Sequence, residues 1–264
     1  MGEALDDDER VIFRKITGRE REPLERCEEL WGIVGRRGGK SRAIATLAVY
    51  LACFVDYGSV VAIGERLVVL CLAQNAKQAG VVFSYIVGIL DAVPMLAKLI
   101  KNKTVETLSL ANGVEIEVRA AHFRGIRGIT AAAIIWDEMC FWFTDDTGSQ
   151  NPDSEILNAA RPALATTNGI LACISSPTRA AARLTTLGCA TMAAKGDPRI
   201  LIAQGASRDF NPSLPERVVA RALERDPLAA RAEYLAEWRS DIEGFVSFEA
   251  VQAVIDKGVI ERAA

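Results

Sequence analysis

The glycine-rich segment at residues 31–41, WGIVGRRGGKS, constrains the fold of this 264-residue chain more than any other feature. A short apolar run ends in glycines, a Lys-Ser pair follows, and a long apolar helical pattern begins at Ser41. Backbone N–H groups of such a turn can surround phosphate oxygens, with Lys40 reaching the β- and γ-phosphates and the Ser41 hydroxyl holding Mg²⁺. The start of the helix adds the positive end of its dipole. The segment therefore predicts a phosphate-binding loop between a strand and a helix.

The loop departs from the usual pattern, G-x-x-x-x-G-K-[ST], at its first glycine. Val34 occupies that position, and the glycine follows it as Gly35. Arg36 and Arg37 lie inside the loop, where most loops of this kind carry small or neutral residues. A cationic side chain beside a bound triphosphate can contact the γ-phosphate or pair with a neighbouring acid, so we expect at least one of them to be functional. The residues predicted to bind nucleotide are Gly35, Arg36, Arg37, Gly38, Gly39, Lys40, Ser41 and Arg42.

Strand and helix signals alternate along the first 207 residues. Near-continuous apolar strands joined by helices favour a parallel sheet that is covered on both faces, and hence an α/β fold. We expect strands at 30–34, 66–73, 104–110, 114–120, 132–136, 170–175 and 199–203, with a hairpin turn at Gly113. Helices are expected at 41–54, 75–90, 154–160 and 179–195, and the first 28 residues are charged and helix-compatible.

The pattern changes at Asn211 and Pro212, where short helical stretches separated by Pro or Gly begin. They cover residues 215–224, 227–238 and 248–257. We therefore expect two parts: a core over residues 1–207, and a small helical lid subdomain over residues 208–264. The lid should pack beside the phosphate-binding loop and end in the start of a linker.

The second strong motif is IIWDE at residues 134–138, an apolar strand that ends in two acids. A strand delivers such acids to the carboxyl edge of the sheet, where open α/β sheets bind their ligands. There Asp137 would hold Mg²⁺, and Glu138 would orient and deprotonate an attacking water. A strand end that turns into an acidic loop is the alternative. The position of the motif, about a hundred residues after a phosphate-binding loop, favours the catalytic interpretation.

Two further segments are ambiguous when taken alone. Ser175, Ser176 and Pro177 lie at the end of the next core strand, where hydroxyls could reach the γ-phosphate or its water, but an ordinary strand-to-turn segment fits equally well. Arg124 and Arg127 are flanked by glycines and precede the acidic strand. An arginine offered to the transition state can supply a factor of roughly 10³–10⁵ in rate, whereas the alternative is a solvated basic turn.

The charge balance limits how the chain could contact nucleic acid. A formal net charge of −3 excludes a globally basic binder, so contact with DNA would need a local patch. Lys98, Lys101 and Lys103 form a basic cluster after a predicted helix. A solvated surface is the favoured interpretation of this cluster, with contact to a DNA backbone as the alternative.

Taken together, these motifs resemble the large terminase subunit of tailed bacteriophages, the motor that packages DNA into the procapsid. GRRGGKS resembles that family's deviant phosphate-binding loop, and RGITAAAIIWDE is similar to the run that leads to its Asp-Glu pair. DSEILNAARP and GILACISSP resemble the helix and the coupling motif that follow, and the Asn-Pro pair at 211–212 resembles the start of the lid. TGRE at 17–20 is a weaker match. The resemblance covers nearly the whole chain but only the first half of such a protein.

The resemblance implies a P-loop NTPase of the additional-strand, catalytic-glutamate class, in which an extra strand separates the loop strand from the acidic strand. Carried over, Lys40 and Ser41 bind phosphate and Mg²⁺, and Asp137 is the second metal ligand. The catalytic residues implied are Glu138, Arg127, Arg36 and Lys40, with Arg36 acting within its own chain and Arg127 acting on the next subunit. Ser175, Ser176 and Pro177 couple hydrolysis to movement.

The implied function is Mg²⁺-dependent ATP hydrolysis that drives double-stranded DNA into a procapsid, in the cytoplasm of an infected bacterial host. The implied partners are DNA, the portal protein and procapsid, the small terminase subunit, and further copies of this chain in a homo-oligomeric ring, a pentamer in the working motor. No membrane partner and no nuclease activity are expected. A helicase-like or remodelling ATPase and a non-catalytic nucleotide switch are the alternatives, and Glu138 argues against the switch.

Overall fold

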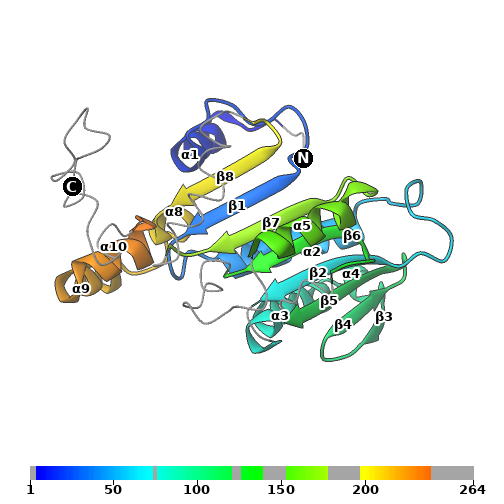
Figure 1. Ribbon diagram of the computed structural model, residues 1–264. Helices are drawn as coiled ribbons and strands as arrows, with labels where there is room; N and C mark the ends of the chain where they lie inside the picture. Colours follow the sequence, from blue (N-terminus) through cyan, green and yellow to red (C-terminus); the bar gives the residue numbers. More distant parts are fainter. Residues whose placement is uncertain (1–3, 74–75, 121–125, 139–152, 178–196, 239–264) are drawn as a thin grey trace, which may run out of the picture.

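The computed structural model describes residues 4–73, 76–120, 126–138, 153–177 and 197–238. In this part of the chain, one sheet holds eight strands in the order β3-β4-β5-β2-β6-β7-β1-β8 (Figure 1). Six of them run parallel to one another, and β3 and β4 complete one edge in antiparallel pairing. The strands are β1 (Glu29–Val34), β2 (Leu67–Ala73), β3 (Ile100–Lys103), β4 (Thr107–Leu110), β5 (Val114–Ala120), β6 (Thr130–Asp137), β7 (Ile170–Ser175) and β8 (Ile200–Gly205).

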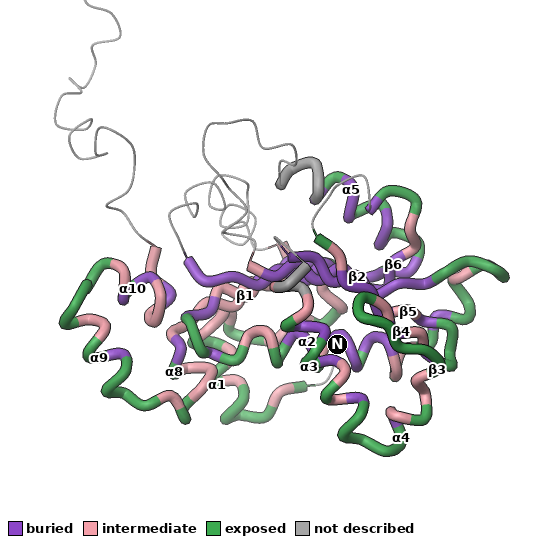
Figure 2. The backbone as a smooth tube through the Cα atoms, turned by 90° about the horizontal axis from the view of Figure 1, so that it is seen from below, coloured by how far each residue is buried: buried purple, intermediate pink, exposed green. Residues whose placement is uncertain are grey.

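Helices cover both faces of the sheet, as Figure 2 shows with α5 on one side and α2 and α3 on the other. Val69 and Cys71 of β2 pack with α2 and α3 in one hydrophobic core, whereas Leu70 and Leu72 pack with α5 in a second core. This alternation explains why β2 is buried along its whole length. The helices are α1 (Asp7–Thr17), α2 (Lys40–Cys53), α3 (Ala76–Ala92), α4 (Pro94–Ala97), α5 (Asp153–Ala165), α8 (Ser207–Phe210), α9 (Glu216–Arg225) and α10 (Pro227–Leu235).

The structure confirms the mixed α/β architecture and the expected hairpin, in which Gly113 adopts a φ of 88° between β4 and β5. It also places β7 between β1 and β6, which is the position expected for an additional strand. Sequence analysis missed β3, α4 and α8. The cause at β3 is that lysines fill an edge strand with an exposed surface, so no apolar alternation marks it. The helices expected at 179–195 and 248–257 lie outside the described residues.

The last three described helices, α8, α9 and α10, lie together beyond the carboxyl ends of β1 and β8 (Figure 1). α9 packs against α10, and α1 packs against β8 on the same side of the molecule. Among the helices of the described part of the chain, none combines the length and the apolarity that crossing a membrane would require.

Candidate active site

The loop between β1 and α2 is tightly turned and closely packed. Arg37 and Gly39 both adopt left-handed φ angles, of 64° and 83°, and the Gly38 N–H donates to the Gly35 carbonyl at 3.1 Å. Gly35 is confined because a Cβ at this position would overlap the Ser207 hydroxyl. The unusual placement of the first glycine is therefore a packing requirement of this fold as well as a feature of the motif.

Side chains of α8 and the residue after it hold the carbonyls of the loop. The Ser207 hydroxyl donates to the Arg36 carbonyl at 2.6 Å, and Asn211 Nδ2 donates to the Arg37 carbonyl at 2.8 Å. The Arg36 N–H donates to the Glu233 carbonyl of α10, and the Arg36 guanidinium lies 3.4 Å from the Glu233 carboxylate. C=O and N–H point in opposite directions across a peptide unit, so fixing the Arg36 carbonyl turns the Arg37 N–H away from Ser207. Sequence reasoning missed Ser207, which lacks a motif of its own.

The lysine of the loop meets the acidic and the serine motifs at the carboxyl ends of three adjacent strands. Lys40 Nζ lies 3.0 Å from Glu138 Oε1 and donates to the Ser176 hydroxyl at 2.7 Å. The Ser175 hydroxyl approaches Glu138 Oε2 at 3.4 Å, and the Ser176 hydroxyl donates to the Val34 carbonyl at 2.9 Å. These contacts arise because β6, β7 and β1 are neighbours in the sheet, so their ends bring together motifs that lie far apart in the sequence. Pro177 follows them and is buried.

Asp137 is a buried residue, and one of its carboxyl oxygens lacks a hydrogen-bond partner among the described residues. Its exposed fraction is 5%, and its Oδ1 has no hydrogen-bond partner among the described residues. The pKa of Asp137 is raised to about 6, mainly by burial and next by the Glu138 charge, while Lys40 partly opposes both. Hard divalent cations prefer carboxylate and hydroxyl oxygens, so the chemistry of this buried carboxylate oxygen fits a Mg²⁺ ligand.

Glu138, the next residue, has a backbone conformation that few side chains adopt. Its φ is 54°, and its N–H donates to the Ile174 carbonyl of β7 at 2.8 Å. A positive φ at a residue other than glycine is unfavourable and persists only where the surroundings enforce it. Here the bond to β7 and the ion pair with Lys40 hold the carboxylate at the strand end.

A groove of about 840 Å³ begins at the loop and extends between α2, α3 and the segment after α8. Its loop end offers backbone N–H groups and the Lys40 side chain, and Arg37 and Arg42 are exposed there. Its far end is lined by Val81 and Tyr85. The groove therefore combines a cationic end for phosphates with an apolar wall, and its volume is within the range of small-molecule sites.

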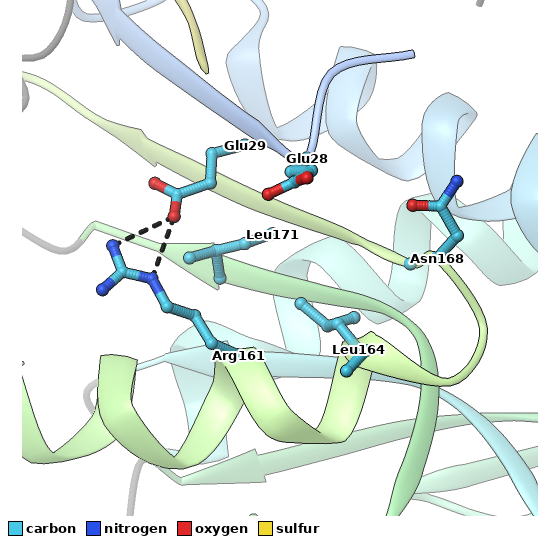
Figure 3. Close-up of a pocket in the computed structure, with 8 residues that line it drawn as sticks. Glu28, Glu29, Arg161, Leu164, Asn168 and Leu171 are labelled. Carbon is cyan, nitrogen blue, oxygen red and sulfur yellow. Dashed lines mark hydrogen bonds and ion pairs between the residues drawn. The ribbon is translucent and has the colours of Figure 1, made fainter. Parts of the chain in front are cut away.

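A smaller cavity of about 330 Å³ lies at the opposite, amino-terminal edge of the sheet (Figure 3). Arg161 of α5 points toward Glu29, and its Nε and Nη2 both lie 3.0 Å from Glu29 Oε1. The other oxygen, Glu29 Oε2, accepts a bond from Trp31 Nε1 at 3.0 Å. Both oxygens are therefore bonded, so this cluster has the character of a structural ion pair that fastens α5 to β1.

The structure does not bring Arg127 to the other candidate site residues. Arg127 is exposed and lies in a turn three residues before β6, so it is near the amino end of that strand. Asp137 is at the carboxyl end, and a strand of eight residues is about 25 Å long. Arg127 is therefore far from the phosphate-binding loop of its own chain. Arg124 lies outside the described residues.

No model of a known protein family and no curated protein sequence matches the chain. Solved structures do match it. The large terminase of bacteriophage HK97 has a TM-score of 0.62 at 18% identity, over 89% of this chain and 56% of that one. The ATPase domain of the large terminase of Thermus phage P74-26 has a TM-score of 0.58 at 19% identity, over 89% of this chain and 99% of that one.

A third similar structure is the large terminase of the thermophilic bacteriophage D6E in complex with ADP, with a TM-score of 0.53 at 15% identity, over 80% of this chain and 48% of that one. The chain thus spans about half the length of the HK97 large terminase and the full ATPase domain of the P74-26 protein. Identities this low establish a shared fold. The chain has the fold of the ATPase domains of phage large terminases.

Proposed function

We propose that this chain is the ATPase part of a large terminase subunit, which hydrolyses ATP with Mg²⁺ to move double-stranded DNA into a procapsid. The observation that carries the proposal is the convergence of Lys40, Glu138, Ser176 and the buried Asp137 at three adjacent strand ends. It occurs in a chain with the fold of terminase ATPase domains, and one large terminase that the chain resembles was solved with ADP. We assign the core to residues 1–207 and the lid to 208–264.

In the proposed reaction, the triphosphate replaces the present partners of Lys40. The ammonium group moves from Glu138 and Ser176 to the phosphate oxygens, and this releases the Glu138 carboxylate to accept a proton from the attacking water. Asp137 and the Ser41 hydroxyl would hold Mg²⁺, which stabilises the charge that develops on the phosphate oxygens. Arg36 belongs to the loop, where it is paired with Glu233 before the nucleotide binds, and its proposed role is to act within its own chain.

Loss of the γ-phosphate would return Lys40 to Glu138 and Ser176, which lies at the end of β7. Ser175, Ser176 and Pro177 are therefore the proposed coupling segment, because this strand end changes its partners during the cycle. The proposed partners are DNA, the portal protein and procapsid, the small terminase subunit and further copies of the chain in a ring, a pentamer in the working motor. The proposed location is the host cytoplasm, with no membrane contact.

The test is ATP turnover by the 264-residue chain with and without duplex DNA, beside the variants Lys40→Ala and Glu138→Gln. The wild type should hydrolyse ATP when Mg²⁺ is present. Glu138→Gln should still bind a fluorescent ATP analogue while turnover falls about 10²–10⁴-fold, because only the general base is lost. Lys40→Ala should lose binding. A wild type that binds ATP and never turns it over would overturn the enzymatic proposal in favour of a nucleotide switch.

A further inference from the structure

Helix α9 carries three arginines along one line of its surface. Arg217, Arg221 and Arg225 are spaced four residues apart, so they lie nearly one above another and span about 12 Å of the helix axis. All three are exposed, whereas Val219, on the opposite side of the helix, is buried. Figure 2 shows how much of α9 is exposed. We call these three residues the arginine ridge.

The charge of the ridge is not neutralised within the part of the chain that the structure describes, where none of the three arginines forms an ion pair. Two of the nearby acids have other partners. Glu216 pairs with Arg208 at 3.0 Å, and the Asp226 carboxylate accepts the Ala229 N–H at 3.0 Å as the cap of α10. Glu224 is the remaining acid of α9. Three guanidinium groups in a row are thus held toward solvent by a chain whose net charge is −3.

The ridge is connected to the nucleotide loop through one intervening helix. α9 packs on α10, and Glu233 of α10 contacts both the backbone N–H and the guanidinium of Arg36 in the loop. One helix therefore separates the ridge from the site where phosphates would bind. The lysine cluster that contains Lys98 and Lys101 lies at the far end of the sheet, around β3, and has no such connection (Figure 1).

We propose that the arginine ridge contacts the phosphate backbone of double-stranded DNA. This inference rests on the proposed function and names the surface that would grip the substrate. Phosphates of one strand follow one another every 3.4 Å along the duplex axis, so about 12 Å of helix spans three to four of them. Guanidinium forks match phosphate oxygens and read no sequence, as a motor that moves any DNA requires. Because α9 packs on α10, a shift of α10 would move the DNA backbone that is bound to the ridge.

The test compares two triple variants of equal charge change. One replaces the ridge (Arg217→Gln, Arg221→Gln and Arg225→Gln), and the other replaces the lysine cluster (Lys98→Gln, Lys101→Gln and Lys103→Gln). Binding of a fluorescent 30-base-pair duplex is measured by anisotropy between 50 and 200 mM salt. The ridge variant should lose about tenfold or more in affinity at low salt, and its slope of log K against log salt should fall by about 2–3. The lysine variant should resemble the wild type.

Further readouts separate the possible failures. Both triple variants should keep the thermal stability and the ATP-analogue binding of the wild type, and Arg221→Lys should keep most of the salt slope. If the ridge variant misfolds, the single change Arg221→Glu should weaken DNA binding on its own. Equal losses in both triple variants, or none in the ridge variant, overturn the inference and leave the ATPase proposal intact. If the ridge variant loses self-association in sedimentation but keeps DNA binding, the ridge contacts an acidic surface of another copy of the chain and not DNA. A wild type that binds no duplex overturns both proposals.

Discussion

The two edges of the sheet bury charge in opposite ways. At the amino edge, Glu29 has both carboxylate oxygens bonded, one to Arg161 and the other to Trp31. At the carboxyl edge, Asp137 is buried with an oxygen that has no partner among the described residues, and the pKa of its carboxyl is raised to about 6. A fully bonded buried charge stabilises a particular packing, whereas an unsatisfied one costs stability and persists where a ligand completes it. The comparison therefore separates a structural edge from a functional one.

The largest expected effect is on turnover, and it concerns Arg127. This residue lies at the amino edge, yet we propose that it acts on the active site of a neighbouring copy, so the amino edge would then also have a functional residue. Arg127→Ala should lower turnover by about 10³-fold or more if its guanidinium stabilises the transition state. Turnover of the wild type should rise steeply with protein concentration. The sharper experiment mixes Arg127→Ala with Glu138→Gln, two variants that are inactive alone.

Mixing should restore activity, since some interfaces then combine an intact Arg127 from one copy with an intact Glu138 from the other. Arg21→Ala, an exposed arginine elsewhere on the surface, is the control and should leave turnover unchanged. Full activity of Arg127→Ala at every concentration would remove the trans assignment and leave the amino edge purely structural.

The next prediction concerns the free energy of unfolding, which substitutions at the two edges should change in opposite directions. Asp137→Asn removes a buried carboxylate that is costly without its cation, so the free energy of unfolding of the ligand-free protein at pH 8 should rise by up to about 3 kcal/mol. Glu29→Gln weakens a satisfied cluster and should lower it by about 1–3 kcal/mol. Urea unfolding in EDTA measures both. Turnover should show the reverse order, lost in Asp137→Asn and retained in Glu29→Gln.

The pH dependence of the ligand-free protein should carry the signature of Asp137. Its folded pKa is higher than its unfolded value, so the folded state binds the proton more tightly, and this contribution to stability is present below about pH 4 and lost as pH rises through about 6. The difference in the free energy of unfolding between the wild type and Asp137→Asn should therefore increase between pH 4 and 6 and stay constant above pH 6. A difference that is the same at every pH would mean that the carboxyl titrates normally when buried.

Much of this site could be predicted from the sequence, because the chemistry of each motif is local. A glycine-rich turn before Lys40 and Ser41, and a strand that ends in Asp137 and Glu138, predict a phosphate loop and an acidic strand end without tertiary information. The sequence likewise predicted all six parallel strands, and the apolar runs are clearest in β2, β6 and β7, because strands that are buried on both faces are apolar nearly throughout.

What could not be predicted depends on contacts between distant parts of the chain. The ion pair of Lys40 with Glu138 exists because β7 brings their two strands to a fixed separation, and no pattern encodes that distance. Ser207 sits in a helix of four residues, too short to leave a periodic signal, and its hydroxyl matters only through the carbonyl of Arg36. Sequence reasoning found the groups that are proposed to react and missed a hydroxyl that bonds to the loop beside them.

The smallest predicted effect tests that missed residue. Ser207→Ala removes the donor to the Arg36 carbonyl and leaves the carbonyl to find another partner, at a cost of about 0.5–1.5 kcal/mol. If the hydroxyl orients the loop for phosphate, the cost should appear as about 2–10-fold weaker binding of ATP with a smaller change in kcat. Ser84→Ala, which removes an exposed hydroxyl bonded to the Gly80 carbonyl in α3, is the matched control and should leave binding unchanged. A loss of thermal stability in Ser207→Ala with unaltered affinity would make Ser207 a packing residue of the lid. The orientation of the loop would then be assigned to its other contacts, such as those with Asn211 and Glu233.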